Sequence, residues 1–466
     1  MLPPLFENRI RNQLQEQAPV FFESLLQSPT TALRIHPHKT FAIPSNWQKI
    51  PWCKEGYYLP GRPSFTLDPR FHAGAYYVQE PSSMILAAFS FFHEPVKVLD
   101  LCAAPGGKST LLATLLPPGS LLWSNEAIAN RASILKENCI RWGYPGHIIT
   151  QNQPHELNML QEFFDYILVD APCSGEGLWR KEPLAVQEWT PYYLEKCVVR
   201  QRQILEAAIP LLKVGGTLVY STCTFNPAEN EENIIYLLKK YPSILQLKTI
   251  HLASTWGWTE NRDHEGKVLG YTAWPHRVKG EGLFFAVLQK ISALPYNDSK
   301  QQTSTKFKNS QHIFQSISSR HKAILPLSWL ELINQKLYQK DNFIFALTPE
   351  ELKLPKGPHY LKVGICIGQI KGKDFIPSHE LALSLMRGKE IPTTSLEYEQ
   401  AIMYLKKEDI HSLNTTPGFS IATYQDLPLG WIYVSGKRIN NKLPSSWRIR
   451  QNIPPQQDLQ PLKSIS

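Results

Sequence analysis

Between about Tyr76 and Lys290, short apolar runs alternate with segments of helical periodicity. The runs that predict strands are 96–101, 120–126, 165–172, 217–223 and 282–290. A helix is expected after each of the first three, and the last of these helices should end at Gly215-Gly216. Strands that alternate with helices predict a parallel sheet with crossover helices. We therefore expect an α/β, doubly wound, Rossmann-like core that binds its ligands at the carboxyl ends of its strands.

The 466 residues are enough for roughly two to four domains. Helical patterns precede the α/β region, and a polar stretch that contains NDSKQQTSTKFKNSQH follows it. Such a stretch buries too little apolar surface to fold. The expected divisions are a helical N-terminal extension (1–75), the α/β domain (76–291), a polar linker (292–313), an intermediate C-terminal domain (314–395), a second C-terminal domain (396–450) and a loose tail (451–466).

Charge is distributed unevenly along the chain. The formal net charge is +9, of which +8 falls in residues 291–466. A basic region beside a nearly neutral one suggests an acidic partner such as nucleic acid, although a surplus of this size often only solubilises a surface.

Seven cysteines occur without any C-x-x-C pair. This pattern indicates free thiols rather than a disulfide framework or a zinc site, and we expect no bound metal. The N-terminus has no apolar segment of the signal-peptide type, and the longest apolar stretch, 84–92, is far shorter than the ~20 residues that span a bilayer. We expect a cytoplasmic monomer without membrane association.

The first strand leads into a loop of small residues that opens a helix. Such a loop lets the backbone approach a ligand, and the helix N-terminus offers free N–H groups to an anion. The dinucleotide fingerprint G-x-G-x-x-G is absent. The phosphate-loop pattern G-x-x-x-x-G-K-[ST] is matched from Cys102 to Ser109 except for its first glycine. ATP is therefore the second choice of ligand for this loop.

S-adenosylmethionine fits the loop better than ATP. Asp100 ends the first strand, and the second strand ends at Glu126, where a carboxylate accepts both ribose hydroxyls. The predicted cofactor contacts of the loop are Cys102, Ala103, Ala104, Pro105, Gly106, Gly107 and Lys108.

Two further strands each lead into a cysteine, Cys173 after Asp170 and Cys223 after Tyr220-Ser221-Thr222. A lone cysteine at a strand end is more often a small core residue than a nucleophile. Two of them at the carboxyl edge of one sheet, where the cofactor loop must lie, favour a reactive pair.

Thiols at this place suit methylation of cytosine. Carbon 5 of cytosine is a poor nucleophile until a thiolate adds to carbon 6. A base must then remove the proton from carbon 5, and an acid near ring nitrogen 3 must stabilise the charge. Cys223, Cys173 and Asp170 could fill these roles, and the residues alone leave open which thiol attacks.

Other nearby residues have weaker patterns. Lys181 follows the Asp170 strand by a short loop and could orient the base, or it could be a solvated lysine. Glu229 stands at the start of the helix after Cys223, where acidic residues usually cap. Trp274 could stack on a base or belong to the core.

Four motifs together resemble the Sun-type family of RNA 5-methylcytosine methyltransferases. They occur in order as DLCAAPGGKST (100–110), LVDAPCSGEGLWRKEP (168–183), YSTCTFNPAENE (220–231) and WPHRVKGEGLFFAVL (274–288). Residues 361–385 and 427–450 are similar to the C-terminal region of the bacterial branch called RsmF, which ends in a small PUA-like RNA-binding domain.

The resemblance implies an S-adenosylmethionine-dependent enzyme that methylates cytosine in 16S ribosomal RNA, with the rRNA or the small ribosomal subunit as its partner. It implies that Cys223 attacks carbon 6, that Cys173 assists proton removal and product release, and that Asp170 binds the cytosine edge as well as the cofactor. It also implies RNA-binding roles for 1–75 and 396–450.

One departure from the family pattern concerns the residues after the strand that ends near Thr150. Family members place there an acidic residue that holds the adenine amino group, whereas this chain has Gln151-Asn152-Gln153. Asn152 could still accept this hydrogen bond. The alternatives at this stage are a non-catalytic RNA-binding assembly factor, a P-loop nucleotide hydrolase, and an enzyme with tRNA or DNA as its substrate.

Overall fold

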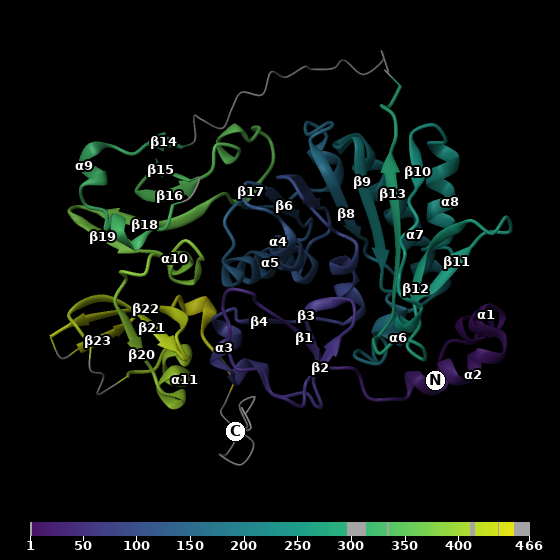
Figure 1. Cartoon of the computed structure of the whole chain (residues 1–466), viewed down its shortest axis with the longest axis horizontal. Helices are drawn as coiled ribbons and strands as arrows, with labels where there is room; N and C mark the ends of the chain where they lie inside the picture. The colour runs from purple at the N-terminus through teal and green to yellow at the C-terminus, as the bar shows by residue number, and fades with distance from the viewer. Residues whose placement is uncertain (1, 296–313, 333–334, 411–414, 437, 452–466) are drawn as a thin grey trace.

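The computed structural model describes residues 2–295, 314–332, 335–410, 415–436 and 438–451 (Figure 1). The expected linker and tail therefore lie almost wholly outside the described residues. Four β-sheets organise the described regions of the chain. No helix among these residues is both long and apolar enough to span a bilayer.

The N-terminal region is helical only at its start. Helices α1 (Pro4–Leu14) and α2 (Ala18–Leu25) precede a four-stranded antiparallel sheet of order β2-β3-β1-β4. Its strands are β1 (Ala32–Ile35), β2 (Gln48–Ile50), β3 (Cys53–Tyr58) and β4 (Tyr76–Val78), with the short helix α3 (Pro69–His72) before β4. The prediction of a helical extension therefore holds only for residues 4–25. The sheet was missed because strands of three to six residues are too short to show a clear alternation.

The central sheet has ten strands, and its middle is the predicted parallel core. The parallel strands run in the order β9-β8-β5-β6-β7. Their bounds are β5 (Lys97–Asp100), β6 (Leu121–Asn125), β7 (His147–Thr150), β8 (Phe164–Asp170) and β9 (Leu212–Thr222).

The flanking strands of this sheet are antiparallel, so the predicted parallel sheet forms the middle of a larger mixed sheet. Beyond β9 lie β13 (Leu283–Lys290), β12 (Val268–Ala273) and β11 (Thr259–Arg262), and β10 (Leu245–Leu247) also pairs with β13. The apolar run of β13 predicts a buried strand but carries no information about its direction.

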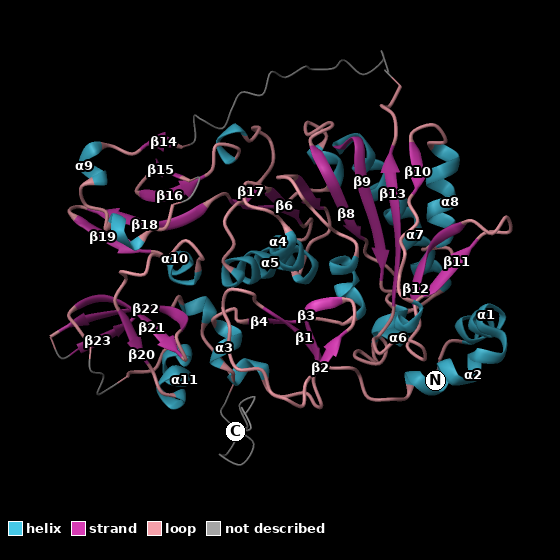
Figure 2. Cartoon of the chain, in the orientation of Figure 1, coloured by secondary structure: helices cyan, strands magenta, loops and turns pink. Residues whose placement is uncertain are grey.

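Helices cover both faces of the central sheet (Figure 2). Val98 and Leu122 face one apolar core with helix α4 (Gly107–Leu115) and the end of α5 (Ala129–Trp142). Leu99 and Trp123, one position further along each strand, face the other core with α7 (Pro191–Ala208) and α8 (Glu231–Lys240). Successive strand residues point to opposite faces, so the continuous apolar runs follow from burial on both sides. A one-turn helix, α6 (Ala185–Glu188), precedes α7.

Helix α7 ends earlier than predicted. It stops at Ala208, and Gly215 and Gly216 lie inside β9. Gly215 has a φ of +85°, and the pairing of β8 with β9 shifts register at this end. The two glycines therefore mark an irregular step in a strand rather than a helix stop.

The C-terminal region contains two further sheets, of orders β14-β15-β16-β18-β19 and β20-β21-β22-β23. The elements are β14 (Gln315–Ser316), α9 (Ser319–Lys322), β15 (Lys336–Lys340), β16 (Phe343–Leu347), β18 (Ile365–Lys371), β19 (Asp374–Pro377), α10 (His379–Leu383), β20 (Thr393–Ser395), α11 (Tyr398–Lys406), β21 (Gly418–Tyr424), β22 (Leu427–Ser435) and β23 (Arg438–Asn441).

These C-terminal sheets are joined closely to the rest of the molecule. Strand β17 (Tyr360–Lys362) pairs with β7 and extends the central sheet. Leu67 and Ala73, from the N-terminal region, share an apolar core with residues of α11 and β22. The basic C-terminal region is therefore packed against the core and is not a free arm.

Arg34 in β1 connects the N-terminal sheet to the start of α4. It is fully buried, and its guanidinium donates to Gln79 Oε1 at 3.0 Å, to Thr110 Oγ1 at 2.6 Å and to the Gly107 carbonyl at 3.3 Å. It also lies 4.4 Å from the centre of the Trp142 ring. Burial lowers the pKa of Arg34 to about 10, so the charge persists at neutral pH and is compensated by these contacts.

Replacement of Arg34 by methionine should lower the free energy of unfolding by about 1–3 kcal/mol, because buried acceptors lose their donor. Denaturant unfolding monitored by circular dichroism measures this change. The exposed Arg62→Met is the matched control and should stay within about 0.5 kcal/mol of the wild type. Equal losses in the two variants would contradict the role of Arg34.

Candidate active site

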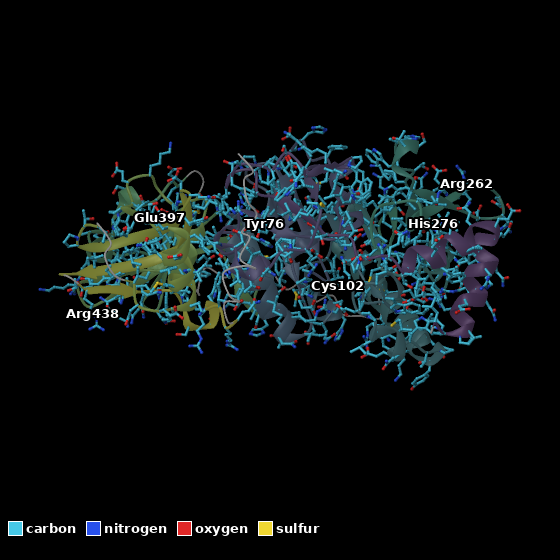
Figure 3. The ribbon with its side chains drawn as sticks, turned by 90° about the horizontal axis from the view of Figure 1, so that it is seen from below. Tyr76, Cys102, Arg262, His276, Glu397 and Arg438 are labelled. Carbon is cyan, nitrogen blue, oxygen red and sulfur yellow. The ribbon has the colours of Figure 1, made fainter. Side chains whose placement is uncertain are left out.

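The loop from Cys102 to Gly106 lies between the end of β5 and the start of α4. Gly106, with a φ of +111°, is the residue before the helix. A Cβ on Gly107 would lie 3.3 Å from Tyr77 Cε1, so the N-terminal sheet closes against the helix start. Figure 3 places Cys102 in the middle of the molecule, between the C-terminal sheet with Arg438 and the region of His276.

Asp100 lies fully buried under this loop. Its Oδ2 accepts from Ser109 Oγ at 2.6 Å, while Oδ1 has no hydrogen-bond partner among the described residues. Burial raises the pKa of Asp100 to about 7. The bond to Ser109 continues through Ser124 Oγ (3.0 Å) to His147 Nε2 (2.8 Å). A buried carboxyl oxygen without a partner is an unfilled acceptor beneath the predicted cofactor loop.

Glu126 lies next to the loop, directly after β6. It is 4 % exposed, and its carboxylate accepts from the Ala104 N–H at 3.4 Å and from the Ile128 N–H at 3.0 Å. Arg131 approaches it to 3.8 Å and donates to the Ala104 carbonyl. The structure thus brings together the loop and the acidic residue predicted to hold a ribose.

Acidic side chains gather around Cys102. Burial raises the pKa of the Cys102 thiol well above its ordinary value, and the neighbouring carboxylates of Glu126, Asp100 and Asp170 raise it further. The opposing charge at Cys102 is that of Arg131. Three carboxylates around one loop favour a positively charged ligand such as a sulfonium.

The two predicted thiols meet at the carboxyl edge of the sheet. Asp170 pairs with Ser221 in the parallel register of β8 and β9, so the chain beyond each strand enters the same space. Cys173 Sγ and Cys223 Sγ lie 3.2 Å apart. The hydrogen bond to Cys223, together with burial, raises the pKa of Cys173 well above its ordinary value.

Asp170 lies beside the thiol pair with both carboxylate oxygens engaged. Lys108 Nζ lies 2.7 Å from Oδ2, and Ser221 Oγ donates to Oδ1 at 2.7 Å. Although burial disfavours its charge, the Asp170 carboxylate raises the pKa of Lys108 above its ordinary value, and Cys223 contributes in the same direction. Lys108 therefore connects the cofactor loop, Asp170 and the surroundings of Cys223.

Glu229 holds the Cys173 loop, a role that the sequence did not reveal. It is fully buried and does not cap α8, which begins at Glu231. Its carboxylate accepts from the Ser174 N–H at 2.8 Å, from Ser174 Oγ, and from Gln201 Nε2 at 2.9 Å. Burial raises the pKa of Glu229. The only signal in the sequence was an acidic residue before a helix, and such residues usually face solvent.

Glu176 connects the same loops to helix α1. It is fully buried and accepts from Arg9 Nη2 at 2.7 Å, from Trp189 Nε1 at 3.0 Å and from the Phe225 N–H at 3.1 Å. Trp274 stacks on Phe225 with ring centres 5.0 Å apart and is 5 % exposed. Trp274 is therefore a core residue and not a stacking platform for a base.

Two predicted site residues lie away from these contacts. The backbone N–H of Lys181 donates to the Leu178 carbonyl, and within the described residues its ammonium group forms neither an ion pair nor a hydrogen bond with a thiol. The amide oxygen of Asn152 accepts from the His359 N–H at 2.9 Å, and its amide nitrogen donates to Glu156 at 3.2 Å. Asn152 thus attaches its loop to the segment before β17, a contact that leaves less capacity for an adenine amino group.

The arrangement as a whole is a loop of small residues, with the carboxylates of Asp100 and Glu126 around it, next to two thiols and the Asp170–Lys108 pair. Among the described residues, no group of three or more His, Cys, Asp or Glu side chains is placed to hold a metal ion. The chemistry that the geometry supports is nucleophilic attack by a thiol next to a bound cationic ligand.

Replacement of Glu229 by alanine should leave the buried Ser174 N–H without its acceptor, while Gln201 Nε2 keeps only the Pro172 carbonyl and Ser174 Oγ only Thr224 Oγ1. We expect the free energy of unfolding to fall by about 2–3 kcal/mol. Disulfide formation between Cys173 and Cys223 with diamide as oxidant should slow by roughly tenfold, because the thiols lose their alignment. Peptide mass spectrometry identifies the pair, and the exposed Glu232→Ala is the control. Wild-type cross-linking rates in Glu229→Ala would contradict this role.

Comparisons with protein families agree with this geometry. Residues 91–289 match the model of the family described as 16S rRNA methyltransferase RsmB/F. Residues 2–81 match the N-terminal domain of 16S rRNA methyltransferase RsmF, and residues 391–449 match the methyltransferase RsmF PUA domain.

A similar solved structure is a methyltransferase homologue from Pyrococcus horikoshii, with 27% identity, a TM-score of 0.51, and coverage of 61% of this chain and 94% of that one. NSun6 from the same organism, solved with SFG, has 21% identity, a TM-score of 0.53 and coverage of 62% and 98%, and shows the fold alone.

Curated relatives match along most of their length. The ribosomal RNA small subunit methyltransferase F of Shewanella loihica is 32% identical over 418 residues, which cover 85% of this chain and 83% of the relative. That of Cronobacter sakazakii is 32% identical over 426 residues, which cover 86% and 85%. These matches exclude the P-loop nucleotide hydrolase. With three family models in order and relatives of this identity and coverage, the chain belongs to the RsmF family of 16S rRNA methyltransferases.

Proposed function

We propose that this protein transfers a methyl group from S-adenosylmethionine to carbon 5 of a cytosine in 16S rRNA, through a covalent bond between Cys223 and carbon 6. The observation that carries the proposal is the pair of thiols 3.2 Å apart, beside Asp170 and at the edge of the sheet that also presents the loop 102–108. The relatives named above are ribosomal RNA small subunit methyltransferases, which supports this substrate.

S-adenosylmethionine fits the loop 102–108 and the carboxylates that surround it. The contacts proposed for it are the backbone of residues 102–108, the carboxylate of Glu126 for the ribose, and Asp170 near the reacting end. The unpartnered Oδ1 of Asp100 is an additional acceptor below the loop. When bound, the cofactor supplies an electrophilic methyl group on a positively charged sulfur, which the surrounding carboxylates favour electrostatically.

Cys223 is the proposed nucleophile. The motif Tyr220-Ser221-Thr222-Cys223 resembles the segment that supplies the attacking cysteine in this family, and we therefore assign the addition to carbon 6 to Cys223. Addition breaks the double bond between carbons 5 and 6, and carbon 5 becomes nucleophilic and takes the methyl group. Asp170 binds the cytosine edge, and Lys108 beside it offsets the charge of the carboxylate.

Cys173 completes the reaction. After methylation, carbon 5 carries both the methyl group and its original proton. Once Cys223 is bonded to carbon 6, it no longer accepts the hydrogen bond that raised the pKa of Cys173, and Cys173 releases its own proton to solvent. The Cys173 thiolate then removes the proton from carbon 5; the double bond re-forms, and Cys223 leaves carbon 6 as a thiolate. The 3.2 Å separation places the base next to the bond that must break.

The RNA must present the target cytosine outside a base-paired stack, because both thiols are partly buried and a stacked base would not reach them. We assign contacts with the surrounding RNA to the N-terminal extension (residues 1–75) and to residues 396–450, which overlap the range 391–449 that matches the PUA domain. The +8 charge of residues 291–466 supports binding to phosphates. An rRNA substrate also supports a cytoplasmic location.

The two thiols have distinguishable effects on the reaction. Cys173→Ala should accumulate a covalent protein–RNA adduct that survives denaturing electrophoresis, because the adduct forms but its release is blocked. Cys223→Ala should form no adduct and transfer no tritium from methyl-labelled cofactor. An adduct in Cys223→Ala but not in Cys173→Ala would exchange the two roles, and full activity of either variant would overturn the mechanism.

Replacement of Glu126 by alanine should weaken S-adenosylmethionine binding by about 10- to 100-fold, since hydrogen bonds to a charged group contribute about 1.5–3 kcal/mol. Isothermal titration calorimetry of the full chain measures this affinity. The exposed Glu94→Ala is the control and should bind as the wild type does. Unchanged affinity in Glu126→Ala would remove the ribose contact from the proposal.

A further inference from the structure

A cavity lies at the end of the central sheet opposite to the thiols. Its volume is about 910 Å³, within the range of small-molecule sites. Ser120 and Gly146, just before β6 and β7, line one wall, and Ser384, Met386 and Ile391 of the C-terminal region line the other. The cavity is therefore at the amino ends of the parallel strands, whereas the loop 102–108 and both thiols are at their carboxyl ends.

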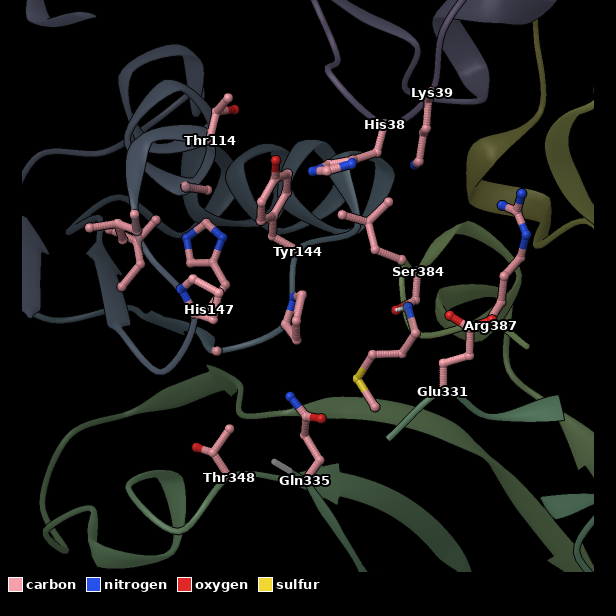
Figure 4. Close-up of a pocket in the computed structure, with 18 of the residues that line it drawn as sticks. His38, Lys39, Thr114, Tyr144, His147, Glu331, Gln335, Thr348, Ser384 and Arg387 are labelled. Carbon is pink, nitrogen blue, oxygen red and sulfur yellow. Dashed lines mark hydrogen bonds between the residues drawn. The ribbon is translucent and has the colours of Figure 1, made fainter. Parts of the chain in front are cut away.

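Two cations enter this cavity without carboxylate partners. Within the described residues, Arg387 forms no ion pair within 4 Å and no side-chain hydrogen bond. Lys39 is 3 % exposed, and its ammonium donates only to the backbone carbonyls of Ala73 (3.0 Å) and Arg141 (2.7 Å). Burial, and then the neighbouring charge of Arg387, lower the pKa of Lys39 well below its ordinary value. Figure 4 shows both side chains on the same side of the cavity.

The charged side chains near the cavity do not balance the positive charges of Lys39 and Arg387. Burial lowers the pKa of Arg387, and the carboxylate of Glu331, which also lines the cavity, partly opposes this effect. Glu331 is exposed to solvent, however. Lys389 adds a further positive charge to the lining. Arg387, partly withdrawn from water, is stabilised when an anion binds to it, and the same anion favours the charged form of Lys39, whose ammonium otherwise has only two carbonyl acceptors. Arginine and lysine together are the usual ligands of a phosphate group.

The side of the cavity across from Arg387 carries aromatic rings (Figure 4). The ring centres of His38 and Tyr144 lie 6.1 Å apart, and His147 also lines this side. His38 is exposed, and its imidazole makes no hydrogen bond among the described residues. Flat rings of this kind stack on nucleobases.

We propose that this cavity is a nucleotide-binding site, with the phosphate at Arg387 and Lys39 and the base against His38 and Tyr144. Two sources share this chemistry: a nucleotide of a bound RNA strand, and a free mononucleotide. The RNA source rests on the RNA substrate proposed above, whereas the mononucleotide source does not.

Uridine 5′-monophosphate, inorganic phosphate and a 12-nucleotide oligouridylate are the probes, because none of them contains the adenosine of the cofactor or the cytosine of the reaction. Their affinities for the full chain are measured by calorimetry or competition. The variants are Arg387→Gln and His38→Ala, with Lys373→Gln, an exposed cation of the same C-terminal region, as the control.

Arg387→Gln should weaken nucleotide binding about 10-fold or more, and His38→Ala should weaken it by about 5-fold or more without changing phosphate binding. Lys373→Gln should change neither. An effect on the oligouridylate identifies the RNA source, and an effect on uridine 5′-monophosphate without binding of the oligouridylate identifies the free nucleotide; both support the site.

Equal affinities in wild type and Arg387→Gln for all probes would overturn the site. Phosphate binding as tight as nucleotide binding would overturn the nucleotide assignment. Arg387→Lys, which keeps the charge, should retain more of the affinity than Arg387→Gln, and thermal unfolding of each variant detects any loss of folding. Methyl transfer to cytosine-containing rRNA by the same wild-type preparation tests the proposed function separately.

Discussion

The parallel register of β8 and β9 is the constraint on which the site depends. It pairs Asp170 with Ser221, so that the loops beyond the two strands enter one space and bring Cys173 and Cys223 to 3.2 Å. Gly177 strengthens this arrangement: its N–H donates to the Cys223 carbonyl at 2.9 Å, and a Cβ there would lie 3.0 Å from the same oxygen. The Glu229 carboxylate accepts a hydrogen bond from the Ser174 N–H and so holds the loop that carries Cys173. A shift of one residue in the pairing of β8 with β9 would turn the paired side chains of one strand to the opposite face of the sheet. The loops beyond the strands would then no longer bring the thiols together.

The terminal regions of the chain are components of the core rather than additions to it. Arg34 joins the N-terminal sheet to the first turn of α4, the helix that follows the cofactor loop. From the other end, β17 completes the central sheet beside β7, and His359 binds the amide oxygen of Asn152. Removal of the C-terminal region would therefore expose a sheet edge and release the Asn152 loop, so the RNA contacts proposed for this region must be measured with point variants in the full chain.

Much of the central fold followed from periodicity, and the two strand-end cysteines were expected at one sheet edge for the same reason. The direction of β13 did not follow, because an apolar run has no polarity. The three-residue β17 is too short to leave a pattern. Glu229 looked like a capping residue, since its inward orientation depends on Ser174 and Gln201, which are distant in sequence. The assignments of individual site residues remain predictions, because only ligand binding and activity measurements test them.

The most direct measurement of the central claim is bisulfite sequencing of ribosomal RNA from cells that lack the gene, compared with cells complemented by the wild type or by Cys223→Ala. The account predicts that at least one cytosine of 16S rRNA is protected from conversion by the wild type and becomes fully convertible in the deletion and in Cys223→Ala cells. An identical pattern of protected cytosines in all three strains would contradict a cytosine methyltransferase that acts on this RNA through Cys223.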